Sequence, residues 1–248
     1  MKSEFLSTAA HELRTPMTSI FGFVQLLRLR EMDGPKRREI LDTIARQSDL
    51  MMAIINQLLD LARIEARQGS DFVLEHVALQ DVVGSSVADY RPPSGRVAPT
   101  VEADGPPLLV EVDRQKLQQA VLNILSNAYK YSPQGGEVRL RYRAEPGPAG
   151  LRHGVSVRDQ GIGMTAEQVA HVCERFYRAD ASGNIPGTGL GMSIVKEIVE
   201  LHRGEVQFDS APAQGTEVTL WLPAASSPCR PLATAEGPEG QARLATKD

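Results

Sequence analysis

Cysteine is scarce in this sequence, and the two cysteines that are present form no pattern. Cys173 and Cys229 are far apart, and Cys229 lies in a stretch with almost no large apolar residues. A disulfide framework is therefore not expected, and a reducing compartment such as the cytosol fits this composition.

Long apolar runs are missing as well. No segment approaches the roughly 20 apolar residues that cross a bilayer, and no signal peptide is recognisable. The net charge of −4 gives no electrostatic basis for binding nucleic acid or anionic membranes. We therefore expect a cytoplasmic chain with no membrane span and no nucleic-acid partner, although a longer parent protein could carry a membrane anchor.

The first part of the chain, residues 1–68, has the pattern of two long helices. Apolar residues alternate at spacings of four and three, as packed helices require, first over 2–31 and again from Ile40. The break at Asp33-Gly34-Pro35 predicts a turn, and thus an antiparallel hairpin. The two seams are Leu6, Ala10, Leu13, Met17, Ile20, Val24 and Leu27, and Ile40, Ile44, Gln47, Met51, Ile54, Leu58 and Leu61.

One hairpin cannot cover all of its apolar side chains. Phe21, Phe23, Leu41, Leu50, Ile55 and Leu59 widen the stripe beyond a single seam. Two hairpins that pair into a four-helix bundle would cover both faces, so the sequence predicts a homodimer.

The period changes after residue 68, and 69–223 reads as an α+β domain. Short alternating runs predict strands that are interspersed with helices, which favours a sheet with helices on one face. The strands are expected at Phe72–Val77, Val97–Glu102, Leu108–Val112, Glu137–Arg143, Leu151–Arg158, Glu205–Asp209 and Thr216–Leu222, and the helices at Leu79–Tyr90, Arg114–Tyr131, Ala166–Cys173 and Leu190–His202. Residues 224–248 have the composition of a disordered tail.

His11 is a candidate nucleophile on the first helix. Its imidazole is partly unprotonated at neutral pH, and the adjacent Glu12 can take a proton from one ring nitrogen. Thr15 lies one turn further on the same face, and Pro16 should kink the helix there. A lone histidine on a helix surface is usually an ordinary exposed residue, so the assignment depends on a phosphoryl donor elsewhere in the chain.

Three downstream motifs suit a nucleotide. Asn123, Asn127 and Lys130 share one helical face, where amides can ligand Mg²⁺ and the ammonium can meet phosphate, and Tyr131 offers a ring to a base. By itself this face could be the polar outside of a helix. The other two motifs are Asp159 with Gly161 and Gly163, and the glycine-rich start of a helix at Gly187, Thr188, Gly189, Leu190 and Gly191.

The two glycine motifs differ in what they can bind. A carboxylate at the strand end, Asp159, can accept a hydrogen bond from the adenine amino group while Gly161 and Gly163 let the backbone pass close to the base. A glycine-rich helix start exposes amides to phosphates. The glycine spacing is neither a Walker loop nor a Rossmann fingerprint. Alone, the Asp-Gly-Gly motif could be a plain turn.

These motifs, in this order from Lys2 to roughly Pro223, closely resemble the catalytic core of the two-component sensor histidine kinases. The resemblance implies a dimerising hairpin that carries the phosphorylated His11, followed by an α/β sandwich that binds ATP and Mg²⁺. It implies magnesium ligands at Asn127 and Asn123, transfer to a response regulator receiver domain, and removal of that phosphate with Thr15. Residues 174–186 resemble the ATP lid. No lysine or arginine lies between Ala179 and Pro186, so Arg175 or Arg178 must supply the positive charge of the lid.

Two alternatives have different consequences. A gyrase- or chaperone-like ATPase would place a water-activating Glu where this chain has Asn123, and His11 would then have no role. A catalytically silent scaffold would bind ATP as a dimer without turnover.

Overall fold

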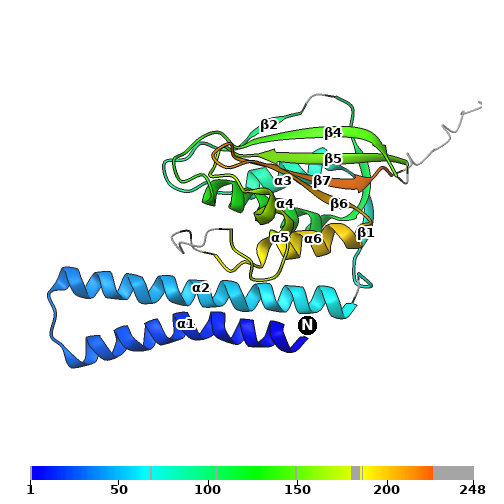
Figure 1. Cartoon of the computed structure of the whole chain (residues 1–248). Coiled ribbons are helices and arrows are strands. Elements are labelled where there is room, and N and C mark those ends of the chain that lie inside the picture. Colours follow the sequence, from blue (N-terminus) through cyan, green and yellow to red (C-terminus); the bar gives the residue numbers. More distant parts are fainter. Residues whose placement is uncertain are drawn as a thin grey trace, which may run out of the picture.

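A computed structural model describes residues 2–67, 69–103, 105–148, 150–179, 185 and 187–225. A long helical hairpin lies along one side of a layered α/β domain (Figure 1). The hairpin consists of α1 (Lys2–Leu29) and α2 (Gly34–Arg67). Its turn contains a capping bond at the predicted break, because the Asp33 side chain accepts the backbone N–H of Lys36 at 2.9 Å. No described helix has the length and apolar character to cross a membrane.

The seam predicted on α2 is confirmed. On α1, Leu13, Ile20 and Leu27 are half-buried as predicted, whereas Ala10, Met17 and Val24 are exposed. Ile40, Ile54 and Leu61 are buried. On α1 the buried residues, among the side chains that the structure describes, are Ala9 and Pro16, and Met17 is 63% exposed. The heptad pattern does not tell which side of a wide apolar stripe meets the partner helix of the same hairpin. The helix continues through Pro16 as one element.

A second apolar stripe on the hairpin stays uncovered in the single chain. It runs over both helices and consists of Met17, Phe21, Val24, Leu41, Met52, Ile55 and Leu59, all of them exposed. The predicted four-helix bundle requires an apolar stripe of this kind, against which the hairpin of a second chain would pack.

The second part of the chain is built on a five-stranded sheet. The strand order is β2 (Thr100–Glu102), β4 (Arg139–Gly147), β5 (Gly150–Arg158), β7 (Thr216–Pro223) and β6 (Glu205–Ser210). Neighbours are antiparallel except β2 and β4, which are parallel. A separate antiparallel pair is formed by β1 (Leu74–Ala78) and β3 (Leu109–Asp113).

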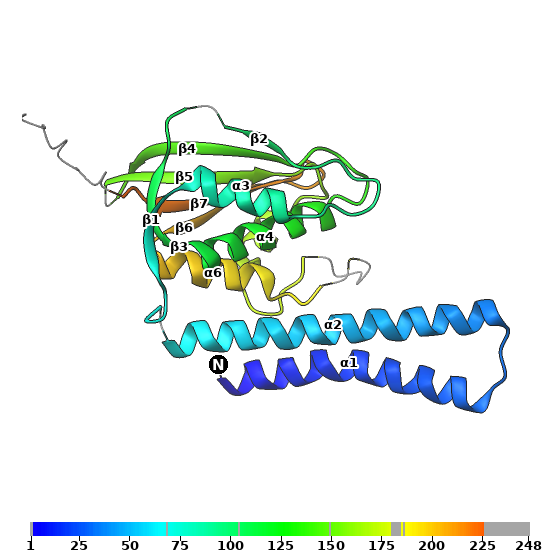
Figure 2. The same cartoon turned by 180° about the vertical axis from the view of Figure 1, so that it is seen from behind.

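The helices lie between the sheet and the hairpin (Figures 1 and 2). They are α3 (Leu79–Asp89), α4 (Arg114–Lys130) and α6 (Gly191–Leu201), with the short α5 (Ala166–His171) at one end. The predicted α+β class, with helices on one face of the sheet, is confirmed.

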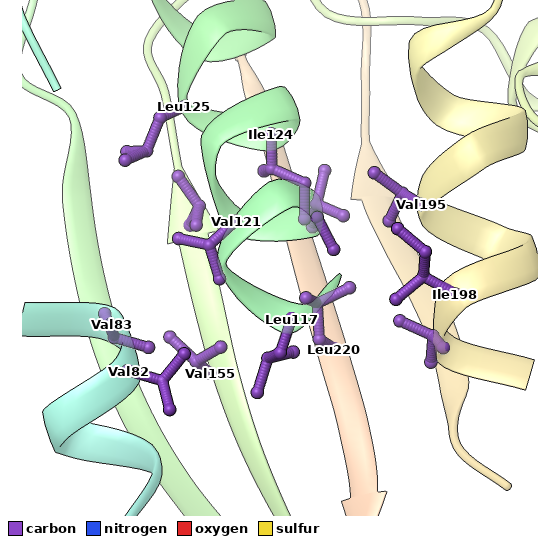
Figure 3. Close-up of a cluster of buried hydrophobic side chains, with 14 of the residues drawn as sticks. Val82, Val83, Leu117, Val121, Ile124, Leu125, Val155, Val195, Ile198 and Leu220 are labelled. Atoms are coloured by element: carbon purple, nitrogen blue, oxygen red, sulfur yellow. The ribbon is translucent and has the colours of Figure 1, made fainter. Parts of the chain in front are cut away.

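Apolar side chains from three helices meet the strands in one core (Figure 3). The residues at its centre are Val82, Val83, Leu117, Val121, Ile124, Leu125, Val155, Val195, Ile198 and Leu220. The opposite face of the sheet is charged; on β4, Arg141 pairs with Glu102 at 2.6 Å while its neighbour Leu140 is fully buried. This alternation is typical of a strand with one buried face.

The sheet region extends slightly beyond residue 223. Ala224 bridges to Val110, and the N–H of Ala225 donates to the carbonyl of Leu109 at 2.9 Å. The first two residues of the expected disordered tail are therefore ordered against β3, because their backbone groups find partners there. The rest of that prediction lies outside the described residues.

Candidate active site

A cavity of about 530 Å³ opens between the sheet, α4, the glycine-rich loop and α2. Most of the predicted nucleotide residues line it, although they come from three distant segments of the sequence. Those residues are Asn123, Asn127, Lys130, Tyr131, Asp159, Gly163, Gly187, Thr188, Gly189 and Gly191. Gly161, Leu190 and Arg178 are not on its wall, and neither are His11, Glu12 and Thr15.

One end of the cavity is apolar with a buried carboxylate. Asp159 is 6% exposed, and its Oδ1 accepts the N–H groups of Gly161 at 2.8 Å and of Thr216 at 3.2 Å. Burial raises the pKa of Asp159 above its ordinary value, and the two backbone bonds oppose that shift. The surrounding wall is formed by Val157, Ile162, Met164, Phe208 and Val218. This combination suits a purine ring whose amino group needs an acceptor.

Two glycines let the backbone pass tightly beside this end. A Cβ on Gly163, whose φ is +64°, would lie 1.9 Å from the carbonyl oxygen of Ala211. A Cβ on Gly161 would lie 2.2 Å from the carbonyl oxygen of Tyr131. Gly161 therefore packs behind the wall and fixes the turn, whereas Gly163 is part of the wall itself.

α4 brings polar residues to the cavity wall, and its C-terminal end adjoins the turn after Asp159, because the N–H of Ile162 donates to the carbonyl of Tyr131 at 3.0 Å. Asp113 caps this helix by accepting the N–H of Lys116 at 3.0 Å. The Nζ of Lys130 donates to the Oη of Tyr131 at 3.0 Å and lies over its ring, and no carboxylate of the described residues pairs with it. A cation with only a neutral partner at a cavity wall suits an anionic ligand.

The glycine-rich loop closes against α4. A Cβ on Gly187 would lie 2.1 Å from Nζ of Lys130, and one on Gly189, whose φ is +71°, would lie 2.6 Å from the backbone of Phe176. The hydroxyl of Thr188 accepts the N–H of Leu190 at 3.2 Å just before α6 begins. The absence of side chains keeps the start of α6 open to phosphate.

His11 lies outside the cavity. Its side chain is 73% exposed, and its Nδ1 is 3.7 Å from Oε1 of Glu12. The hydroxyl of Thr15 donates to the carbonyl of His11 at 3.4 Å. α2 lies nearer to the α/β domain than most of α1 does (Figures 1 and 2), although Phe5 of α1 contacts Phe176. His11 and the cavity are therefore separate sites in this structure.

The lid arginines point to protein partners. Nη2 of Arg178 donates to the carbonyl of Ile185 at 2.6 Å. Arg175 pairs with Glu65 of α2 and lies 3.5 Å from Glu197 of α6. The structure therefore does not bring Arg178 to the cavity, and its phosphate contact stays a prediction. Residues 180–184 and Pro186 of the expected lid lie outside the described residues.

α2 forms one wall of the cavity, which the sequence did not indicate. The wall residues from this helix are Arg46, Asp49, Leu50, Ala53 and Gln57. Gln57 accepts the hydroxyl proton of Thr188, and Oδ2 of Asp60 accepts from Nε2 of Gln119 at 2.8 Å. The heptad pattern gives only the packing face of α2, so nothing in it could reveal contacts with another domain.

Comparison with known proteins agrees with this arrangement. Residues 1–67 match the family described as His Kinase A (phospho-acceptor) domain. Residues 112–226 match the family described as histidine kinase-, DNA gyrase B- and HSP90-like ATPase. The chain belongs to the histidine kinase family. This histidine kinase core therefore joins a phosphoacceptor hairpin and an ATPase-like domain, as its sequence predicts.

Individual relatives support the family assignment. The histidine kinase core is 33% identical over 239 residues to the cell-division control histidine kinase PdhS of Brucella canis, covering 90% of this chain and 22% of that protein. The mycobacterial sensor histidine kinase MprB is 34% identical, with a TM-score of 0.51, over 61% of this chain and 98% of that one. The histidine kinase AdeS of Acinetobacter baumannii shares the fold, with a TM-score of 0.65 at 20% identity, over 87% of this chain and 98% of that one. The chain spans less than a third of the length of the curated relatives that it matches first.

Proposed function

We propose that this chain transfers the terminal phosphoryl group of ATP to His11, and then to an aspartate of a response regulator receiver domain. The observation that carries the proposal is the cavity, whose wall combines a buried acceptor, Asp159, set among apolar side chains, with Asn127, Lys130 and the glycine-rich loop. Both ends of an adenine nucleotide are thus matched by side chains of the right chemistry.

The transfer uses the free base of His11. One ring nitrogen attacks the terminal phosphorus, the bond between that phosphorus and the bridging oxygen breaks, and ADP leaves with the bonding electrons. The proton of the imidazole passes to Glu12 or to water, because the carboxylate is 3.7 Å from Nδ1. Lys130 and the amides at the start of α6 offset phosphate charge, so catalysis rests on positioning and electrostatics.

Mg²⁺ fits this site. Asn127 and Asn123 bring amide oxygens to the cavity wall, and magnesium is usually held by one or two protein groups together with substrate phosphates. The ion would neutralise phosphate charge. We propose Asn127 as the main ligand, with Asn123 assisting.

The partners follow from the hairpin. We propose that two chains pair through the exposed stripe that contains Met17, Phe21 and Leu59, since this stripe is too apolar to stay in water. The exposed surface around His11 would then receive the receiver domain. Thr15, one turn from His11, would orient water during removal of phosphate from the regulator.

The structure also weighs against an ATPase that hydrolyses its nucleotide. The α4 residues that line the cavity include no carboxylate, and Asn123 lies where a water-activating Glu would be needed. A silent scaffold would have the same cavity but no acceptor role for His11.

Incubation with ATP labelled on the terminal phosphate separates the three functions. A kinase acquires label that is lost in acid and kept in alkali, as expected of phosphohistidine. An ATPase releases labelled phosphate without labelling the protein, and a scaffold does neither. Absence of protein-bound label under conditions in which ATP binds would refute the proposal.

A further inference from the structure

The described residues that line the cavity include two cations. One is Lys130 of α4, and the other is Arg46 of the hairpin helix α2. The lid adds none in the described part of the chain, because Arg178 bonds to the Ile185 carbonyl and Arg175 pairs with Glu65. The sequence between Ala179 and Pro186 contains no lysine or arginine either.

Arg46 is available for an anionic ligand. Its guanidinium donates to the hydroxyl of Thr43 at 2.8 Å, which is a neutral partner. Arg46, Leu50, Ala53 and Gln57 recur at helical spacing and all line the cavity, so they form one face of α2. Gln57 anchors this face to the glycine-rich loop through Thr188, about three turns or about 16 Å along the helix from Arg46.

The layers of the fold determine which part of a nucleotide reaches α2. Asp159 follows β5 in the sheet layer, whereas α2 lies on the far side of the helical layer (Figures 1 and 2). The glycine-rich loop, which would hold the phosphates, contacts α2 through Thr188 and Gln57. A nucleotide with its base at Asp159 and its phosphates at this loop would therefore have its terminal phosphate on the side of the cavity that α2 lines.

We propose that Arg46 binds the terminal phosphate of ATP and so lets the hairpin distinguish ATP from ADP. The inference rests on the proposed function and adds a residue from outside the α/β domain to its nucleotide site. While ATP is bound, the contact ties the α/β domain to α2. ADP lacks the terminal phosphate, so the tie is lost once the phosphoryl group has been transferred.

Asp49, three positions further along α2, also lines the cavity. Its carboxylate repels phosphate and offsets part of the attraction of Arg46. Removal of the Arg46 charge should therefore weaken ATP binding, and removal of the Asp49 charge should strengthen it. If this face of α2 had only a structural role, the two substitutions would not have opposite effects.

The test is a titration of the whole chain with the magnesium salts of a non-hydrolysable ATP analogue and of ADP. The variants are Arg46→Gln, Asp49→Asn and the control Arg38→Gln, which removes the same charge from an exposed position of α2 outside the cavity wall. Arg46→Gln should weaken the analogue roughly tenfold and ADP less than about twofold, as loss of one charge-assisted contact predicts. The difference should shrink at high salt.

Asp49→Asn should tighten binding of the analogue, and Arg38→Gln should change neither ligand. Equal weakening of both ligands by Arg46→Gln, or no weakening, would overturn the inference while leaving the proposed function intact. Unchanged or weaker analogue binding by Asp49→Asn would contradict the charge argument. If the unmodified chain binds neither nucleotide, the proposed function itself fails.

Discussion

Replacement of Asp159 by asparagine should separate nucleotide binding from stability. Both backbone bonds of Asp159 are made by the same oxygen, Oδ1, which accepts from Gly161 at 2.8 Å and from Thr216 at 3.2 Å. An asparagine can keep both with its carbonyl oxygen. Its amide nitrogen then takes the place of Oδ2, and a donor replaces the acceptor that the adenine amino group needs.

The expected loss follows from the charge and burial of this group. A hydrogen bond to a charged partner contributes about 1.5–3 kcal/mol, so the dissociation constant for ATP should rise by about ten- to hundredfold. The free energy of unfolding should increase or stay the same in the Asp159→Asn variant. Because burial raises the pKa of Asp159, its folded state favours the protonated form, and that contribution to stability is lost as the pH rises through the raised pKa.

Titration calorimetry with ATP and GTP measures the change in nucleotide affinity, and thermal unfolding at neutral pH measures the change in stability. The new amide donor can face the 6-oxo group of guanine, so the preference for ATP over GTP should shrink. The interpretation of Asp159 would be refuted by wild-type affinity for ATP in a variant that is folded. A large loss of stability would also contradict it, because the backbone bonds are expected to persist.

Three further substitutions test other parts of the structure. Gly189→Ala should weaken nucleotide binding at least about tenfold, since its Cβ would meet the lid backbone at 2.6 Å; unchanged affinity in a titration would exclude the loop from the site. Thr15→Ala should slow dephosphorylation of a phosphorylated regulator roughly a hundredfold and spare labelling of His11, which is the internal control. His202 is buried, and its Nε2 accepts the N–H of Asp113 at 2.9 Å; burial lowers its pKa. Its contribution to stability is therefore present above the ordinary histidine pKa and is lost as the pH falls through the lowered value, by at most about 1.4 kcal/mol per pH unit. Denaturant unfolding of a His202→Gln variant should show a flatter pH dependence, and an unchanged slope would assign the effect to other groups.

The sequence predicted the elements well because its periodicities are strong. The heptads of 2–31 and of the helix that starts near Pro35 correspond to α1 and α2, and the helix expected at Arg114–Tyr131 corresponds to α4. The cavity residues were predictable because small glycine loops and clustered amides carry a local signal. These local signals do not depend on the arrangement of the domains.

The remaining features depend on contacts between distant segments. That Ala9 rather than Ala10 is buried depends on how the two helices of the hairpin are rotated. The turning of Arg178 toward Ile185, and the wall formed by Arg46 and Gln57, depend on where α2 meets the α/β domain. Such contacts leave no periodic trace in either segment, so a single sequence cannot indicate them.

Identification of the phosphorylated residue tests the central claim most directly. The chain has five histidines. His11 lies on the phosphoacceptor hairpin with Glu12 beside it, whereas His171 of α5 is also exposed and pairs with Glu174 at 2.7 Å, so the mapping has to distinguish these two residues. After incubation with Mg²⁺ and ATP, peptides are mapped by mass spectrometry under alkaline conditions, for the unmodified chain and for an Asn127→Asp variant. The account predicts one phosphate, on His11, that is absent from the variant. Phosphate on another residue, or on His11 to the same extent in the variant, would contradict it.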